Sequence, residues 1–328
     1  MLTGRKDAFL YEEHYDDVSG YSNPHESEHD HFTIGHTSTS VSLACGLAKG
    51  RDLKGEDGNV VAIIGDGSLS GGEALEALNY AAELDGNLII LVNDNDMSIA
   101  ENHGGLDQNL RLLRETGGKA ECNLFRAMGL DYRFVADGND IASLIEAFKA
   151  VKDSRQPVIV HIVTQKGKGY QPALDNPTKF HGLGSYCVRD GETQAAPTPT
   201  FSHIFGSTLV ELAREDESIT AITAAMASGT KLDLFKEAFP KRYFDVGIAE
   251  EHGALFACGL AAEGSSDEAA FAEFLQTHCP QTDRETVQHL LDAVQAAQFA
   301  PDPCTTETAQ EIQTLCRKLR KKMCRRTV

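Results

Sequence analysis

Two residues that could bind a metal ion each follow a strongly apolar run. The run Val60–Ile64 leads into a Gly-Asp-Gly-Ser turn that contains Asp66, and the run Asn87–Val92 leads into an Asn/Asp turn that contains Asn95. Carboxylate and amide oxygens are hard ligands of the kind that Mg²⁺ prefers. Gly67 lets the backbone come close to a charged group, and the start of the following helix offers N–H groups to phosphate. The residues therefore predict a site for Mg²⁺ and a diphosphate.

Both turns are expected at one edge of a parallel sheet. Short runs of Val and Ile suit strands that are buried on both faces, and Gly72–Leu84 carries Ala and Leu at helical spacing between them. This strand–helix–strand unit indicates a doubly wound α/β domain. Ligands bind beyond the carboxyl ends of such strands, so Asp66 and Asn95 are expected to meet. A Gly-Asp-Gly sequence alone is more often an ordinary turn, and the second strand end makes the pattern specific.

Composition limits the class of protein. The 328 residues are enough for two α/β domains or parts of them. The formal net charge of −19 argues against nucleic acid as the main partner, although the C-terminal stretch LCRKLRKKMCRRTV is basic. The start lacks the apolar core of a signal peptide, and no run is long enough to span a membrane. The 8 cysteines form no CxxC pair, so we expect free thiols, buried at Cys45 and Cys258, and a cytoplasmic location.

Further elements follow from the residue pattern of the first half. Thr33–Lys49 is predicted to start as a Gly-His turn and continue as a helix of small residues. Glu101–Gly118 is predicted to be a long loop with a helix. Ile141–Lys152 has the apolar spacing of an amphipathic helix, and Pro157–Thr164 reads as another buried strand.

The second half changes character twice. Asp175–Pro199 is rich in turn residues and is interpreted as a linker. A second α/β segment then starts near Phe201 with a helix, the strand ITAITAAM and a later small-residue helix, ALFACGLAAEG. Beyond Gly264 the sequence is polar and predicted to be helical, with no strand pattern.

Several segments together resemble the 1-deoxy-D-xylulose-5-phosphate synthase family of thiamin-diphosphate-dependent, transketolase-like enzymes. The resemblance runs from about Leu2 to Gly264, and it is carried by SGYSNPHESEHDHFTIGHTSTS, GDGSLSGGEALEALNYA, LVNDNDMSIAENHGGL, VTQKGKGYQPALDNPTKFHG and ITAAMASGTKLDLFKEAFPKRYFDVGIAEEH. It implies thiamin diphosphate and Mg²⁺ as cofactors.

The resemblance also assigns the cofactor-binding residues. The implied Mg²⁺ ligands are the side chains of Asp66 and Asn95 and the carbonyl of Met97. Thr37 stands where the family usually has Ser and keeps a hydroxyl. Without the resemblance, His36 would be interpreted as a turn histidine bonded to backbone. The full set of implied cofactor contacts is Gly35, His36, Thr37, Gly67, Ser68, Asn95, Tyr170 and Glu250.

Two residues are implied to act in catalysis, Glu250 and His181. Glu250, the first glutamate of IAEEH, would hydrogen-bond the aminopyrimidine ring of thiamin and promote loss of the reactive proton. Glu251 replaces a more usual Gln. His181, in KFHG, would face the substrate. From the residues alone, Glu250 would favour a helix N-terminus, Tyr170 would be a packing residue, and His181 a surface residue of the linker.

The reaction implied is decarboxylation of pyruvate and transfer of the two-carbon unit to glyceraldehyde 3-phosphate, which supplies isoprenoid, thiamin and pyridoxal synthesis. The family implies a homodimer and no nucleic-acid or membrane partner. Relative to the family, the chain is expected to lack the start of its first domain, most of the second and all of the third. We therefore expect cofactor binding with little turnover. The alternative is a non-catalytic cofactor-binding remnant or interaction module from a rearranged gene.

The predicted domain organisation combines these patterns. The parts are a diphosphate- and Mg²⁺-binding domain at 1–182, a linker at 183–199, a partial pyrimidine-binding domain at 200–264 and an unrelated helical tail with a basic end at 265–328.

Overall fold

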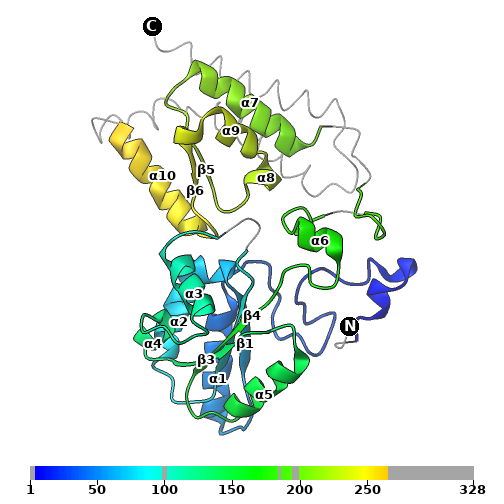
Figure 1. The fold of residues 1–328 in the computed structure, drawn as a ribbon, viewed down its shortest axis with the longest axis vertical. Helices are drawn as coiled ribbons and strands as arrows, with labels where there is room; N and C mark the ends of the chain where they lie inside the picture. Colours follow the sequence, from blue (N-terminus) through cyan, green and yellow to red (C-terminus); the bar gives the residue numbers. More distant parts are fainter. Residues whose placement is uncertain (1–3, 98–101, 184–185, 194–198, 265–328) are drawn as a thin grey trace. The chain divides into compact units, whose positions relative to one another are not determined.

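The computed structural model describes residues 4–97, 102–183, 186–193 and 199–264. The chain divides into two compact units: unit 1 comprises residues 1–96 and 104–164, and unit 2 comprises residues 97–103 and 165–328. Each unit combines helices with parallel strands (Figure 1). The predicted α/β class with a parallel sheet is confirmed. The predicted helical tail at 265–328 lies outside the described residues.

Unit 1 is built on a four-stranded parallel sheet with the order β1-β2-β4-β3. Gly65 lies opposite Asn93, and Asp94 lies opposite Val163. All four strands therefore end at the same edge of the sheet. The strands are β1 (Val61–Gly65), β2 (Ile89–Asp94), β3 (Asp131–Val135) and β4 (Val158–Val163).

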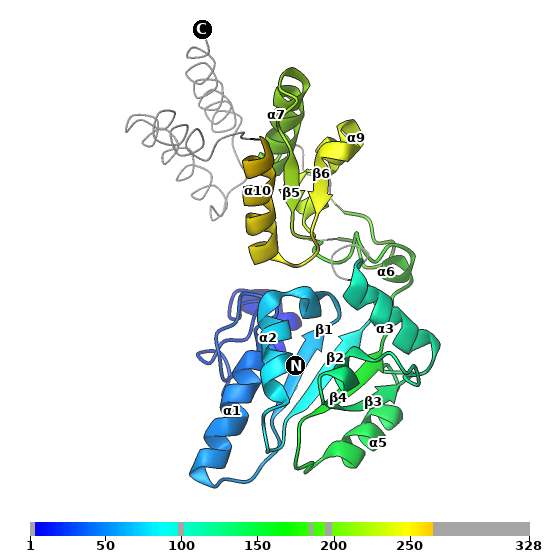
Figure 2. The same ribbon diagram turned by 90° about the vertical axis from the view of Figure 1, so that its left-hand side faces the viewer.

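Helices cover the two faces of this sheet unequally (Figure 2). Alternate residues of a strand point to opposite faces. Ile90 of β2 belongs to a core with α1–α4, whereas Ile89 belongs to a second core with α5. The helices of unit 1 are α1 (Ser40–Lys54), α2 (Gly72–Ala81), α3 (Gly105–Glu115), α4 (Leu124–Ala127) and α5 (Ile141–Val151), with short 3₁₀ turns η1 (Asp7–Phe9), η2 (Glu12–His14) and η3 (Gly67–Ser70).

The prediction that both apolar runs are buried on both faces is correct for β2 and wrong for β1. The side chains of Val61 and Ile63 are 45% and 63% exposed, whereas Ala62 and Ile64 are buried. The reason is position: β1 is an edge strand, and α5 packs against β2, β4 and the other edge strand, β3. The hydrophobic residues of β1 therefore alternate between core and surface.

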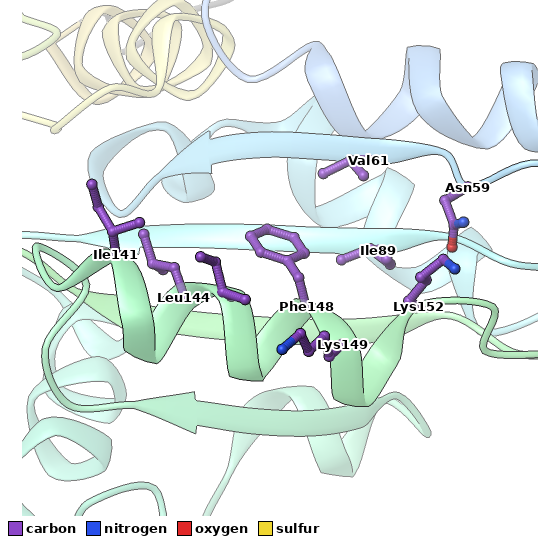
Figure 3. Close-up of a pocket in the computed structure, with 9 residues that line it drawn as sticks. Asn59, Val61, Ile89, Ile141, Leu144, Phe148, Lys149 and Lys152 are labelled. Carbon is purple, nitrogen blue, oxygen red and sulfur yellow. The ribbon is translucent and has the colours of Figure 1, made fainter.

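An apolar groove of about 430 Å³ lies between α5 and this open part of the sheet (Figure 3). Val61 and Ile89 line its sheet side, and Leu144 and Phe148 line its helix side. Ile141, at the start of α5, is 72% exposed. The predicted amphipathic helix is thus present, but its apolar face is only partly covered.

Unit 2 contains a parallel pair of short strands, β5 (Ala221–Thr223) and β6 (Tyr243–Asp245). Its core joins α7 and α9 to β5 through Val210, Ala221 and Phe235. The helix predicted at the start of this segment matches α7, and the strand predicted from ITAITAAM is shorter than expected. The helices are α6 (Gln171–Asp175), α7 (Phe201–Glu215), α8 (Ala227–Thr230), α9 (Asp233–Ala238) and α10 (Glu250–Gly264), with a 3₁₀ turn η4 (Pro240–Arg242). No helix among the described residues is long and apolar enough to cross a membrane.

Candidate functional site

The strand ends of unit 1 are tied together at the carboxyl edge of the sheet. The backbone N–H of Asp66, just after β1, donates to the carbonyl of Asn93 at 3.2 Å. The N–H of Thr164, just after β4, donates to the carbonyl of Asp94 at 2.8 Å. The Thr164 hydroxyl also donates to the side-chain oxygen of Asn93 at 2.7 Å. The residues that directly follow β1 and β4 are therefore hydrogen-bonded to the end of β2.

Asp66 is a buried carboxylate at this edge, with 4% of its surface exposed. Burial, followed by the nearby negative charge of Asp94, raises the pKa of Asp66 to about 6. Hydrogen bonds from the backbone N–H groups of Gly67 and of Asp66 itself oppose this effect. The positive charge of Arg114 lowers the pKa as well, so burial is the main effect that a cation bound to Asp66 would offset.

The predicted Gly-His-Thr turn lies against the predicted diphosphate turn. The hydroxyls of Thr37 and Ser68 are 2.5 Å apart, and the hydroxyl of Ser38 donates to the Ser68 carbonyl at 2.7 Å. Ser38 is buried and has a positive φ of 71°, an unusual conformation for a residue other than glycine. A Cβ at Gly71 would collide with the Ser38 side chain. The two turns are thus packed closely, with Gly35 and His36 exposed beside them.

Asn95 lies in a turn that a buried ionic network supports. Both oxygens of the Asp94 carboxylate accept hydrogen bonds from Arg114 of α3, at 2.7 and 2.8 Å. One of them also lies 2.8 Å from Nε2 of His161, whose Nδ1 is 2.7 Å from the Tyr132 hydroxyl. Asp94 and His161 are fully buried. The turn that carries Asn95 is therefore anchored in the core of unit 1.

The donor set at this edge is suited to a hard cation. Within the described ranges, His, Cys, Asp and Glu side chains do not gather in groups of three that could hold a metal ion. A metal here would need amide or carbonyl oxygens as well as the carboxylate. Asp66 and Asn95, which directly follow β1 and β2, carry a carboxylate and an amide oxygen, and oxygens of these two kinds are typical ligands of Mg²⁺.

Tyr170 and His181 lie in unit 2. Tyr170 precedes α6 and packs its ring against Phe180 and Tyr186, with centroids 5.6 and 6.1 Å apart. The Tyr170 hydroxyl is buried and has no hydrogen-bond partner among the described residues. The Lys166 ammonium donates to Nδ1 of His181 at 3.0 Å. Burial, and then the charge of Lys166, lowers the pKa of His181.

Glu250 begins α10 and is exposed. The turn before this helix is held by Asp245, whose carboxylate accepts hydrogen bonds from the N–H groups of Ala225 and Gly247 at 3.0 and 3.1 Å. The Glu250 side chain is thus presented at the N-terminus of a helix on a fixed turn, where a negative charge is stabilised.

Several residues of these networks were not predicted as site residues, and His161, Ser38, Arg114 and Lys166 are examples. His161 was visible as one polar residue inside the apolar run VIVHIV, which signals a buried polar contact. Ser38 follows Thr37 directly and could have been included in the same turn. Arg114 and Lys166 carry no local signal, because only the folded chain brings them to their partners.

Comparison with protein families gives two matches. The chain matches a family model described as 1-deoxy-D-xylulose-5-phosphate synthase over residues 1–121 and 115–164. A second family model, described as transketolase, pyrimidine binding domain, matches residues 198–299. This second match runs past Gly264, the predicted end of the second α/β segment.

Curated proteins with the name 1-deoxy-D-xylulose-5-phosphate synthase are similar to this chain. The protein from Desulforudis audaxviator is 43% identical over 313 residues, which cover 84% of this chain and 49% of the relative. The protein from Clostridium kluyveri is 43% identical over 313 residues, which cover 84% of this chain and 50% of the relative. The protein numbered 1 from Geobacter sulfurreducens is 42% identical over 315 residues, with the same coverage of 84% and 50%. The chain spans about half the length of the curated relatives it matches.

Proposed function

The chain belongs to the 1-deoxy-D-xylulose-5-phosphate synthase family, and we propose that it binds thiamin diphosphate and Mg²⁺ at the carboxyl edge of the unit 1 sheet. The observation that carries the proposal is the convergence of two predicted turns: Thr37 contacts Ser68, and Asp66 is tied to the end of β2. Sequence segments that are far apart thus supply hydroxyl, N–H and carboxylate groups to one surface.

The proposed ligand assignment follows the donor chemistry. Asp66, Asn95 and the Met97 carbonyl would hold Mg²⁺ through oxygen. The N–H groups of Gly67 and Ser68 would bind the diphosphate, because a glycine-containing turn leaves its backbone open to an anion. Gly35, His36 and Thr37 would border the cofactor.

The proposed roles of unit 2 concern the thiamin ring and the substrate. Glu250 would accept a hydrogen bond from, or share a proton with, the aminopyrimidine, and the Tyr170 hydroxyl would contact the cofactor. His181 would face the substrate. Once bound, thiamin diphosphate would supply the electron sink that decarboxylation and two-carbon transfer require.

The proposed reaction is that of the family: pyruvate is decarboxylated and its two-carbon unit is transferred to glyceraldehyde 3-phosphate. Because Lys166 donates to Nδ1 of His181, the Nε2–H of that ring remains available to donate to a substrate oxygen. The domain division at residues 182 and 200, and a homodimeric assembly, are part of the same proposal.

The test is Mg²⁺-dependent binding of thiamin diphosphate, measured by isothermal titration calorimetry on the full chain. We expect Asp66→Asn to abolish the binding. Because burial disfavours the ionised carboxylate, this substitution should not unfold the protein. Asp85→Ala is the matched control, since Asp85 is exposed in the same unit. Equal affinity of the Asp66→Asn variant and the unaltered chain would refute the assignment.

A steady-state assay with pyruvate and glyceraldehyde 3-phosphate separates an enzyme from a non-catalytic cofactor-binding module. Turnover that disappears in Glu250→Gln would support the proposed catalytic role. Binding without turnover would favour the module.

A further inference from the structure

A single arginine holds the residues on both sides of the predicted metal ligand Asn95. The guanidinium of Arg114 donates to both carboxylate oxygens of Asp94, at 2.7 and 2.8 Å. It also donates to the carboxylate of Asp96 at 2.5 Å. Arg114 comes from the last turn of α3, so its contacts join that helix to the turn after β2.

The conformation of this turn is fixed by further contacts to the same residues. The N–H of Asp96 donates to the Asp94 carboxylate at 3.1 Å, and Asp96 has a positive φ of 62°. On its other side, Asp94 meets the buried ring of His161. Asp96 directly follows Asn95, and its left-handed backbone conformation determines the direction of the chain between Asn95 and Met97. These are the two residues of the turn that would supply oxygens to the metal.

We propose that Arg114 is a positioning residue for the metal site: by clamping Asp94 and Asp96 it sets the geometry in which Asn95 presents its oxygen. This inference rests on the proposed function. Mg²⁺ accepts little deviation from octahedral geometry, and residues that orient a ligand from outside the coordination sphere strongly affect metal affinity.

The two ion pairs of Arg114, one with Asp94 and one with Asp96, differ in burial. This difference makes the positioning role testable. Asp94 is fully buried and the Arg114 side chain is 13% exposed, so their pairing also contributes to the fold. The Asp96 side chain is 53% exposed. Loss of an exposed ion pair costs little stability. If loss of the Arg114–Asp96 ion pair alone weakens metal binding, the cause is therefore the changed orientation of the turn and not a loss of stability.

Three variants separate these effects. Asp96→Asn removes the exposed ion pair and keeps a residue type that tolerates positive φ. Arg114→Lys keeps the charge but loses the planar group that spans both aspartates. Arg111→Lys is the control: Arg111 lies on the same helix, is 56% exposed and pairs with Asp107 at 3.4 Å.

The first readout needs no ligand. In backbone amide NMR spectra of the full chain, we expect the signals of Asn95, Asp96 and Met97 to shift or broaden in Asp96→Asn and Arg114→Lys. They should stay unchanged in Arg111→Lys. Replacement of Asp96 alters these signals in any case, so the decisive variant is Arg114→Lys: unchanged signals there would overturn the inference, because the turn would then hold its conformation without the guanidinium of Arg114.

The second readout is the dissociation constant of Mg²⁺ at a fixed concentration of thiamin diphosphate, measured by calorimetry. We expect it to rise about 10- to 100-fold in Asp96→Asn, with the urea midpoint of the unliganded chain unchanged. Unchanged Mg²⁺ affinity in Asp96→Asn would refute the positioning role even if Arg114→Lys fails to fold. Absence of binding by the unaltered chain would refute the proposed function instead, and with it a role for Arg114 toward a metal.

Discussion

The Tyr132 hydroxyl offers a direct test of the buried network under the candidate metal turn. Burial raises the pKa of Tyr132, so its hydroxyl stays protonated, and this hydroxyl is hydrogen-bonded to Nδ1 of His161 at 2.7 Å. The ring of Tyr132 stacks on Phe125 with a centroid distance of 5.8 Å. Tyr132→Phe preserves this stacking and removes only the hydroxyl. The fully buried His161 then loses the hydrogen-bond partner of its Nδ1.

The expected loss of stability follows from these contacts. One hydrogen bond contributes about 1 kcal/mol, and a buried group left without a partner costs about 1–3 kcal/mol. Because the lost hydrogen bond and the unpaired buried nitrogen partly describe the same effect, the two values do not add in full. We expect Tyr132→Phe to lower the free energy of unfolding by about 2 kcal/mol. With a urea slope of about 2 kcal/mol per molar, the midpoint should fall by roughly 1 M.

Urea unfolding followed by circular dichroism measures this change. Tyr80→Phe is the matched control, because Tyr80 is 51% exposed and its hydroxyl can be replaced by water contacts. The control should leave the midpoint within about 0.3 M. A loss below about 0.5 kcal/mol in Tyr132→Phe would refute the argument that His161 depends on this hydroxyl.

Two further predictions address the second unit and the edge strand. Lys166→Met should raise the pKa of His181, because it removes a cation that disfavours the charged ring, whereas Lys168→Met should not. The folded chain binds the proton of His181 less tightly than the unfolded chain. His181 therefore contributes stability above a pH of about 6.5, and this stability is lost as the pH falls below that value. If the NMR titration curves of His181 superimpose for Lys166→Met and Lys168→Met, the assigned contact with Lys166 is wrong. Ile63→Lys should change stability by less than about 0.5 kcal/mol because Ile63 is 63% exposed, whereas Ile64→Lys should cost several kcal/mol because Ile64 is 3% exposed. Urea midpoints that are equal for the two lysine variants would refute the assigned faces of β1.

The elements that bear local signals were predictable from the sequence. The apolar runs before Asp66 and Asn95 gave β1 and β2, because Val and Ile runs bounded by turn residues favour strands. The helix at Phe201–Glu215 was predictable from its apolar spacing and from Thr200, whose hydroxyl caps it at His203.

The exposure of β1 could not be read from its residues. Val61 and Ile63 are as apolar as Ile89 and Leu91 of β2, and the difference comes from the strand order, which places β1 at an edge away from α5. Strand order depends on contacts between distant segments. A run of apolar residues shows only that burial on both faces would be favourable.

The candidate site was predictable only in part, for the same reason. Motif residues such as Asp66 and Asn95 stand out because glycine, carboxylate and amide groups follow strands. The pairing of Arg114 with Asp94 and Asp96 depends on how α3 packs against the sheet. Arginine is common on helix surfaces, so its type and position in the sequence give no indication of this contact.

The edge position of β1 has a consequence for local opening of the chain. β1 is paired with a neighbouring strand on one side, so its amide hydrogens exchange through local openings of low free energy. β2 and β4 are paired on both sides, and their amide hydrogens exchange through openings of higher free energy. Asp66 directly follows β1, and Asn95 directly follows β2. A cation bound by both residues would fasten the less protected strand to the more protected one. Added Mg²⁺ and thiamin diphosphate should therefore slow hydrogen exchange most in β1, by an amount set by the ligand concentration relative to its dissociation constant.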